Sequence, residues 1–431
     1  MKLLKTLLAL TIALSSLSCR GKSSENIVDN KTTDSKTSND KSKDFSQVSI
    51  EPLKDTDKKI TSSDKVVESN NKFAFKIYSE LLKKEGNIFF SPTSILFCLS
   101  MVYNGSDEKT KEEMEKVLNF SGSTLDEINK SNNTLMRQLA NTDKGVRLDI
   151  ANALFGNKSI NFSNTFKENM SKFYRAEISA LDFSSKDSVK VINEWVKNAT
   201  QSKISKIIDS LSTDDLLVLI NAIYFKGTWS KKFDKAETKT LPFKGGKTTK
   251  DVQMMTNYDE YKYFSSEGIQ GIELPYGDEK MAMYIFLPGE GKGIADFNKE
   301  MSVDKLNEYV KKLRKGKGRI TMPKFKLEYE SSLNEPLSNI GMTDVFSDSA
   351  NLSKLFEKNI SSKLSQVKHK TFVEVNEEGT EAAAVTAGTV TATSIALPEE
   401  PFEMTVDSPF FYLILDKNTK TILFMGSILD L

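Results

Sequence analysis

The stretch GTEAAAVTAGTVTATSIALPEEPFEMTVDSP, residues 379–409, lies between two segments whose patterns predict buried strands. These segments are VKHKTFVEVN (residues 367–376) upstream and FFYLILD (residues 410–416) downstream. The stretch itself has the composition of a strand, with a single charged residue, Glu381, before Glu399. Connections this long in compact domains are usually functional or disordered, and the many Thr and Val residues do not favour disorder. The stretch is therefore the first candidate for function.

The alternation of side chains along this stretch suggests what it could do. If it formed a strand, its even-numbered and odd-numbered residues would face opposite sides. The even side would carry Thr380, Ala382, Ala384, Thr386 and Gly388, and the odd side Glu381, Ala383, Val385 and Ala387. The even side is small enough to slide beneath a sheet, while the charge of Glu381 would stay outside. A loop that enters a sheet as an added strand has this pattern, but a Thr/Ala-rich surface hairpin has it too, and parity alone favours the hairpin.

The residues around the stretch resemble a known family. VNEEGTEAAA (residues 375–384), a variable stretch and SPFFYLILDKNTKTILFMGSI (residues 408–428) are similar to the hinge, reactive loop and C-terminal strands of the serpins. Matching segments follow the family's order after about Val67: NIFFSPTSILFCLSMVYNGS, LDIANALF, INEWVKNATQSKISKII, LVLINAIYFKGTW, IELPYGDEKMAMYIFLP, ITMPKFKLE, GMTDVFSDSANLSKL and LSQVKHK. The resemblance implies a single large domain with a dominant mixed β-sheet, helices packed around it and an exposed reactive-centre loop at about residues 377–401.

Local patterns independently favour the α+β class, because helical segments come early and strands late. Helices are expected at residues 71–84, 93–103 and 110–118, and strands at 148–155 and 216–225. Residues 271–288 predict two strands around the turn at residues 277–280. The net charge is +1, and the basic run at residues 311–319 is interpreted as a solvated helix end, so no nucleic acid is expected as a partner.

The N-terminus predicts export. Residues 1–19 combine Lys2 and Lys5 with a short apolar run and small residues before Cys19, which is the pattern of a signal peptide. The run is too short to span a bilayer. A Cys directly after Ser18 resembles a bacterial lipobox, although Ser16 stands where Leu is commoner. We expect lipidation of Cys19 and a membrane-anchored lipoprotein at the cell envelope or surface; an ordinary secretory signal is the alternative.

The remaining chain divides by composition. Residues 20–66 are rich in Ser, Thr, Asn, Asp and Lys, cannot bury enough apolar surface to fold, and are interpreted as a flexible polar tether. Residues 67–431 are long for one hydrophobic core, since cores usually stop growing near ~250–300 residues. No linker-like break divides them, and together with the resemblance this predicts one serpin domain. We also expect a monomer.

An enzyme is not expected, because the chain lacks the residues that catalysis would need. It has one histidine, His369, and no Gly-x-Ser-x-Gly motif. The residues that a Ser-His-Asp or Cys-His catalytic site needs are therefore scarce. One His and one unlipidated Cys, Cys98, cannot make a zinc site, and GGKTTK at Gly245 lacks the spacing of a P-loop. No metal or cofactor is predicted.

The resemblance implies three groups of site residues. A hydrogen-bonded cluster under the middle of the large sheet, called the shutter, would be Ser91, Ser94, Asn221 and His369. The top of the sheet, called the breach, would hold Trp229, Lys324 and Glu377, the last two able to form an ion pair. The hinge, where the loop begins to insert, would be Glu377, Gly379, Thr380, Glu381, Ala382, Ala383 and Ala384.

The resemblance further implies a suicide-substrate inhibitor that traps a serine protease as an acyl-enzyme, with papain-like cysteine proteases as additional candidate targets. The family's usual spacing places the reactive bond at Thr393-Ser394; because the stretch is longer than in many relatives, Val390, Ile395, Ala396 and Leu397 stay as alternatives. Residues 371–416 contain no Lys or Arg, which excludes trypsin-like targets and favours elastase-like or subtilisin-like ones. The alternative is a non-inhibitory serpin acting as a binding or chaperone-like lipoprotein.

Overall fold

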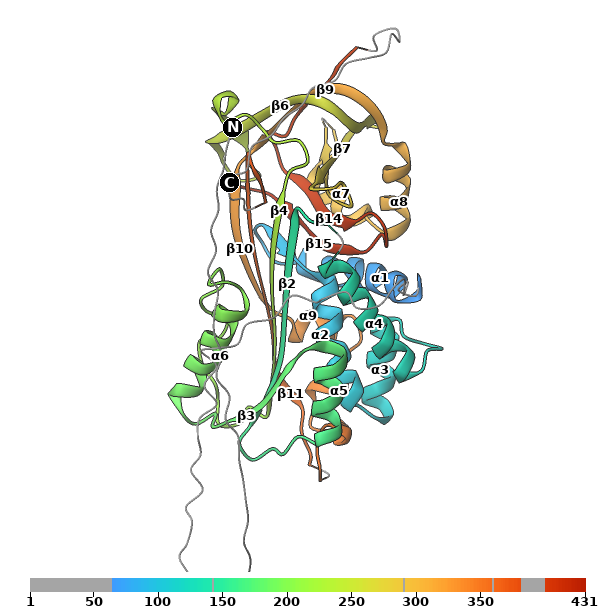
Figure 1. Ribbon diagram of the computed structural model, residues 1–431, viewed down its shortest axis with the longest axis vertical. Helices are drawn as coiled ribbons and strands as arrows, with labels where there is room; N and C mark the ends of the chain where they lie inside the picture. The colour runs from blue at the N-terminus through green and yellow to red at the C-terminus, as the bar shows by residue number, and fades with distance from the viewer. Residues whose placement is uncertain (1–63, 142, 290, 359, 381–399) are drawn as a thin grey trace, which may run out of the picture. The chain divides into compact units, whose positions relative to one another are not determined.

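The computed structural model describes residues 64–431 apart from residues 142, 290, 359 and 381–399 (Figure 1). The predicted signal peptide, Cys19 and most of the predicted tether therefore lie outside the described residues, as does most of the predicted reactive loop. All described residues belong to one compact unit. None of their helices is long and apolar enough to cross a membrane.

The described chain contains α-helices, strands and short 3₁₀ turns in mixed order. The α-helices are α1 (Asp64–Leu81), α2 (Pro92–Gly105), α3 (Glu108–Leu118), α4 (Leu125–Ala140), α5 (Asn164–Tyr174), α6 (Lys186–Ala199), α7 (Ile294–Glu300), α8 (Val303–Lys312) and α9 (Asn334–Asn339). The strands are β1 (Ile88–Phe90), β2 (Val146–Asn157), β3 (Glu177–Leu181), β4 (Leu217–Thr228), β5 (Lys239–Lys244), β6 (Thr249–Ser266), β7 (Ile269–Tyr276), β8 (Met281–Pro288), β9 (Arg314–Pro323), β10 (Phe325–Ser332), β11 (Leu364–Asn376), β12 (Gly379–Thr380), β13 (Phe402–Thr405), β14 (Phe410–Asp416) and β15 (Ile422–Ile428).

The strands form two sheets. Within the described residues, the six-stranded sheet has the order β10-β11-β12-β4-β2-β3 and is mixed, since β11–β4 and β2–β3 are parallel pairs. The nine-stranded sheet has the order β1-β15-β14-β8-β7-β6-β9-β13, with β5 paired to β6. The mixed α+β architecture predicted from the sequence is confirmed. The six-stranded sheet is the one that the predicted reactive loop adjoins.

Helices cover both faces of the six-stranded sheet (Figure 1). On one face lies α2, whose residues are all buried, as its apolar sequence predicted. Ser91 caps its N-terminus by accepting a hydrogen bond from Ser94 N, and Pro92 occupies the first turn, where its missing N–H has no cost. On the other face, α6 packs Ile192, Trp195 and Val196 against strand residues that include Phe155, Ile220 and Phe372. The sheet is therefore buried on both sides at its centre.

Two sequence interpretations are corrected by the elements observed. Helix α1 begins at Asp64 rather than at residue 71, three residues inside the segment interpreted as tether. The basic run at residues 311–319 is not a helix end as a whole: α8 stops at Lys312 and β9 begins at Arg314. Gly318 and Ile320 are buried on either side of the exposed Arg319, and pairing with β6 and β13 decides the strand over the helical preference of Lys and Arg.

Candidate functional site

The six-stranded sheet is split at the end where the predicted reactive loop begins. Strands β11 and β4 pair directly in parallel from Leu364↔Leu217 up to Phe372↔Tyr224. Beyond Phe372 they part, and β12 occupies the space between them. It runs antiparallel to both neighbours, with Thr380 opposite Val375 on β11 and Gly227 on β4. After β11, therefore, the chain reverses at Glu377-Glu378 and enters the sheet as an added strand.

The first hinge residues are buried rather than exposed. Thr380 is inaccessible to solvent, and its hydroxyl makes a 2.7 Å hydrogen bond with the Tyr276 hydroxyl. Gly379 has φ +149°, and a Cβ there would lie 2.0 Å from the Gly227 carbonyl oxygen, so only glycine fits. This corrects the expectation that the loop is exposed from about residue 377. The remaining hinge residues, Glu381, Ala382, Ala383 and Ala384, lie outside the described residues.

Trp229 at the end of β4 fixes the turn between β11 and β12. Its indole Nε1 donates a 2.9 Å hydrogen bond to the Asn376 carbonyl, and its backbone N–H donates to the Glu378 carbonyl at 2.9 Å. Its ring stacks on Tyr276 with the centroids 4.5 Å apart and an interplanar angle of 9°. Because Tyr276 also bonds Thr380, one aromatic pair supports both the turn and the inserted strand.

The other two predicted breach residues form an ion pair. Lys324 Nζ lies 2.9 Å from Glu377 Oε1, which also accepts a 2.8 Å hydrogen bond from Thr238 Oγ1. Burial of the Glu377 carboxyl opposes its ionisation, but the bonds from Lys324 and Thr238 outweigh this effect, so its pKa lies below the usual value. Glu378 is held in the same way, by Lys232 at 2.8 Å and Lys235 at 3.0 Å. Two consecutive carboxylates thus anchor the reversal of the chain.

The four predicted shutter residues lie together below this entrance. His369 on β11 faces Asn221 on β4, with Nδ1 and Oδ1 2.5 Å apart, and the His369 Nε2 accepts a 3.2 Å hydrogen bond from Ser91 N. Because Nε2 is an acceptor, Nδ1 carries the proton and donates to Asn221. The Asn221 amide nitrogen in turn donates to Ser94 Oγ. These bonds close the sheet at its middle.

His369 is neutral in this cluster. Its side chain is inaccessible to solvent, and desolvation lowers its pKa to about 3. A charged imidazole there would lose its Nε2 acceptor and leave the Ser91 N–H without its partner.

The structure adds residues that the sequence did not single out. Asn152 on β2 stands opposite Asn221, and its Oδ1 accepts a 2.6 Å hydrogen bond from the Asn221 amide. An Asn inside the apolar run LDIANALF was a usable signal, since a buried amide needs a partner. Tyr276 and Thr238 carried no such signal, because each becomes part of the site only through the packing of distant strands.

Comparison with known proteins agrees with this geometry. Residues 68–431 match the family model described as Serpin (serine protease inhibitor). The chain belongs to the serpin family. It is therefore a protease-inhibitor relative rather than an enzyme, as the residue supply predicted.

The matches to individual relatives span nearly the full length of those relatives. The chain is 38% identical over 369 residues to a leukocyte elastase inhibitor of Xenopus laevis, a match spanning 82% of this chain and 96% of the relative. Human Serpin B8 is 38% identical over 375 residues, which span 84% of this chain and 98% of the relative. Among solved structures, the native state of the thermophilic serpin tengpin aligns with a TM-score of 0.79 at 30% identity, covering 87% of this chain and 96% of tengpin.

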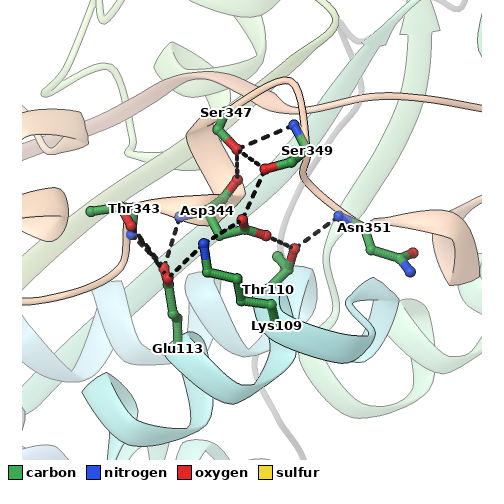
Figure 2. Close-up of polar contacts among 8 residues, drawn as sticks. All are labelled: Lys109, Thr110, Glu113, Thr343, Asp344, Ser347, Ser349 and Asn351. Atoms are coloured by element: carbon green, nitrogen blue, oxygen red, sulfur yellow. Dashed lines mark hydrogen bonds and ion pairs between the residues drawn. The ribbon is translucent and has the colours of Figure 1, made fainter.

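A second polar cluster of this serpin anchors the segment that leads into β11 (Figure 2). On α3, the Glu113 carboxylate accepts hydrogen bonds from the backbone N–H groups of Thr343 (2.8 Å) and Asp344 (2.7 Å). The buried Asp344 carboxylate contacts the Thr110 hydroxyl and lies 3.2 Å from Lys109 Nζ. Burial opposes ionisation of Asp344, but hydrogen bonds including that from Thr110 lower its pKa. Among the described residues no group of His, Cys, Asp and Glu side chains is arranged to hold a metal ion.

Proposed function

We propose that this serpin is a suicide-substrate inhibitor that traps its target protease by inserting the cleaved loop into the six-stranded sheet. The observation that carries the proposal is β12: the first two residues after the turn already pair with both β11 and β4. The protease Oγ would attack the loop carbonyl, the peptide C–N bond would break, and the new amine would leave while an ester holds the protease. Insertion then competes with hydrolysis of that ester.

The register of β12 specifies how insertion would continue. Each residue further along the loop would face the residue one position earlier on β11 and on β4. Ala382 would lie beside Val373 and Phe225, Ala384 beside Thr371 and Ile223, and Thr386 beside His369 and Asn221. These neighbours lie on the buried face of the sheet, and the small side chains of Ala382 and Ala384 suit it.

Insertion must open the shutter. Neighbouring strands lie ~4.8 Å apart, so an inserted strand moves β11 and β4 to roughly 10 Å from each other. The 2.5 Å contact between His369 Nδ1 and Asn221 Oδ1 cannot survive that separation. Thr386 is the next hydroxyl-bearing residue on this face after Thr380, and it would arrive between the two groups that lose their bond. Buried polar groups need partners, so this position favours Thr.

The inserted length would be large enough to displace the protease. Residues 379–393 extended at ~3.3 Å each cover roughly 45–50 Å. The ester would therefore be carried from one end of the sheet toward the other. The driving force would be the release of strain stored in the uncut form.

The sequence of the loop supports a target that prefers small or aliphatic residues. No Lys or Arg occurs in residues 371–416, and Thr393-Ser394 or a neighbouring bond between Val390 and Leu397 would be cut. The match to proteins named leukocyte elastase inhibitor supports an elastase-like target. Subtilisin-like and papain-like proteases are further candidate targets.

We also propose that the mature protein is a lipoprotein anchored through Cys19, with residues 20–63 as a spacer. The lipobox-like pattern supports this. Metabolic labelling with a radioactive fatty acid tests it: wild type should incorporate label, whereas Cys19→Ser should not. If neither protein incorporates the label, the protein is secreted without a lipid anchor.

The decisive experiment is to incubate the protein with a protease panel and search for an SDS-stable adduct, then locate the cut bond by mass spectrometry. Thr380→Arg places a charge on the buried face and should convert the inhibitor into a cleaved substrate. Glu381→Arg, on the opposite side by alternation, is the matched control and should still form adduct. An undiminished adduct yield for Thr380→Arg would refute loop insertion.

A non-inhibitory carrier is the second candidate, favoured by one structural likeness. Human thyroxine-binding globulin in complex with its ligand aligns with a TM-score of 0.78 at 29% identity, covering 86% of this chain and 99% of that chain. Thermal unfolding before and after loop cleavage separates the two. An inhibitor should become much more heat resistant when cut, and a carrier should not.

A further inference from the structure

A cavity of about 260 Å³ opens between the start of α1, the start of α4 and the loop that joins α3 to α4. Its floor is apolar: Val66, Phe120 and Ile128 line it, and each is no more than 5% exposed. Small-molecule sites usually have this form, an apolar hollow with a few polar groups at its edge. Sites for drug-sized ligands measure roughly 300–1,000 Å³, so this cavity suits a smaller molecule.

The sequence builds the cavity at a sharp reversal of the chain. Asn119 ends α3 in the left-handed conformation with φ +56°, and its carbonyl accepts a 2.8 Å hydrogen bond from Ser69 Oγ on α1. Phe120 then packs inward, where its ring meets that of Tyr103 on α2 edge-on, with 5.5 Å between the centroids. The loop is therefore tied to two helices where it borders the cavity.

Two opposite charges stand at the edge of the cavity. Lys65 Nζ lies over the loop, since a Cβ on Gly122 would be 3.6 Å from it. Glu127 Oε2 accepts hydrogen bonds from Thr124 N at 2.8 Å and Thr124 Oγ1 at 2.9 Å, which leaves Oε1 for a ligand. The bonds from Thr124, the backbone one first, lower the pKa of Glu127 and keep it ionised.

The charges and the floor together describe one class of ligand. Lys65 and Glu127 attract each other without forming an ion pair in the described part of the chain, so a molecule with both charges can lie between them. An α-amino acid carries a carboxylate and an ammonium group on one carbon, and a large apolar side chain would fill the floor. A polyanion does not suit the cavity, because Asp126 and Glu127 in the first turn of α4 would repel it.

We propose that this cavity binds a free α-amino acid with a large apolar side chain, of the leucine and phenylalanine class. Lys65 would bind the carboxylate and Glu127 the ammonium group. The side chain would pack on Val66, Phe120 and Ile128. The site goes beyond the proposed inhibition, because it uses no residue of the hinge, the breach or the shutter. Amino acids of this class are end products of protein hydrolysis, the reaction that proteases catalyse.

Saturation-transfer NMR of the full chain with L-phenylalanine measures the binding. The small size of the ligand limits its affinity, so a dissociation constant on the order of 1 mM is expected. N-acetylphenylalanine lacks the ammonium group and phenylalaninamide lacks the carboxylate, so each should bind about tenfold more weakly. Alanine keeps both charges but lacks the apolar body, and it should not displace phenylalanine.

Two variants and a matched control assign the binding to this cavity. Lys65→Met keeps the aliphatic stem, and Glu127→Gln keeps a capping residue for α4, so each removes a charge without removing the fold. Each should raise the dissociation constant about tenfold. Lys72→Met is the control on the same helix, since Lys72 pairs with Glu68 at 2.5 Å, and it should bind like wild type.

The thermal unfolding midpoint of each variant separates lost binding from lost folding. The site is refuted if folded wild type shows no saturation transfer at about 10 mM phenylalanine, ten times the expected constant. It is equally refuted if both charge variants fold and bind phenylalanine as wild type does. Neither result bears on adduct formation with a protease, so the proposed function is tested separately.

Discussion

Acidification should destabilise the native protein through one residue, His369, because it is the only histidine in the chain. Burial lowers its native pKa to about 3, whereas an unfolded histidine titrates near ~6.5. Between these values the unfolded chain binds a proton that the native chain excludes. Native stability is therefore full above about pH 6.5 and is lost as the pH falls toward 3, at about 1.4 kcal/mol per pH unit. From pH 7 to pH 5 the loss is about 2 kcal/mol.

Urea unfolding at pH 7 and pH 5, followed by tryptophan fluorescence, measures this loss. The matched variant is His369→Gln, which has no imidazole and should lose little stability between the two pH values, although it starts less stable. The lowered pKa of Glu377 keeps that carboxylate ionised in this window. A single imidazole resonance also permits a direct check by NMR, where the native signal should not shift between pH 8 and pH 5. A native imidazole that titrates near 6.5, or an equal loss in the variant, would refute the reasoning.

Three further predictions concern the ends of the sheet. Gly379→Ala should expel β12, since the added methyl meets the Gly227 carbonyl at 2.0 Å; hydrogen exchange at Thr380 should rise at least tenfold. Lys324→Met should cost about 1–2 kcal/mol in urea unfolding, because it leaves the buried Glu377 without its cation, and Glu377→Gln in the same background should recover part of the loss. Asp344→Asn should cost about 1–3 kcal/mol, measured in the same way, by weakening the anchor of the segment before β11.

Local patterns predicted the elements whose signals are local. Residues 410–416 were predicted as a strand and form β14, and the pair of strands around the turn at residues 277–280 is confirmed as β7 and β8. The predicted start of α1 was wrong, because Asp64 to Asn70 has the polar composition of a tether. Tertiary contacts decide this helix: Asn70 is buried and donates to the Ile422 carbonyl, and Val66 and Val67 lie in the core.

The site residues likewise divide into those that the sequence indicated and those that it could not. The resemblance supplied Ser91, Ser94, Asn221 and His369, and the structure brings all four together. It could not supply the insertion of Gly379 and Thr380, because that depends on how far β11 and β4 stay paired. A two-residue strand between distant neighbours leaves no periodic signal in the sequence.

If the cleaved loop inserts as proposed, the placement of β12 indicates that the barrier to insertion lies at the shutter. Starting a new strand is the costly step in sheet growth, because the chain must be closed into a turn before any pairing rewards it. Here the turn is already anchored by Lys324 and Trp229, and the first pairs are already made. Residues inserted after Thr380 would meet parted strands as far as Phe372, where direct pairing with Tyr224 begins. From that point every step must break a backbone pair of β11 and β4, and at His369 a buried side-chain bond as well, so the rate of insertion should respond more to changes at His369 and Asn221 than to changes at the turn.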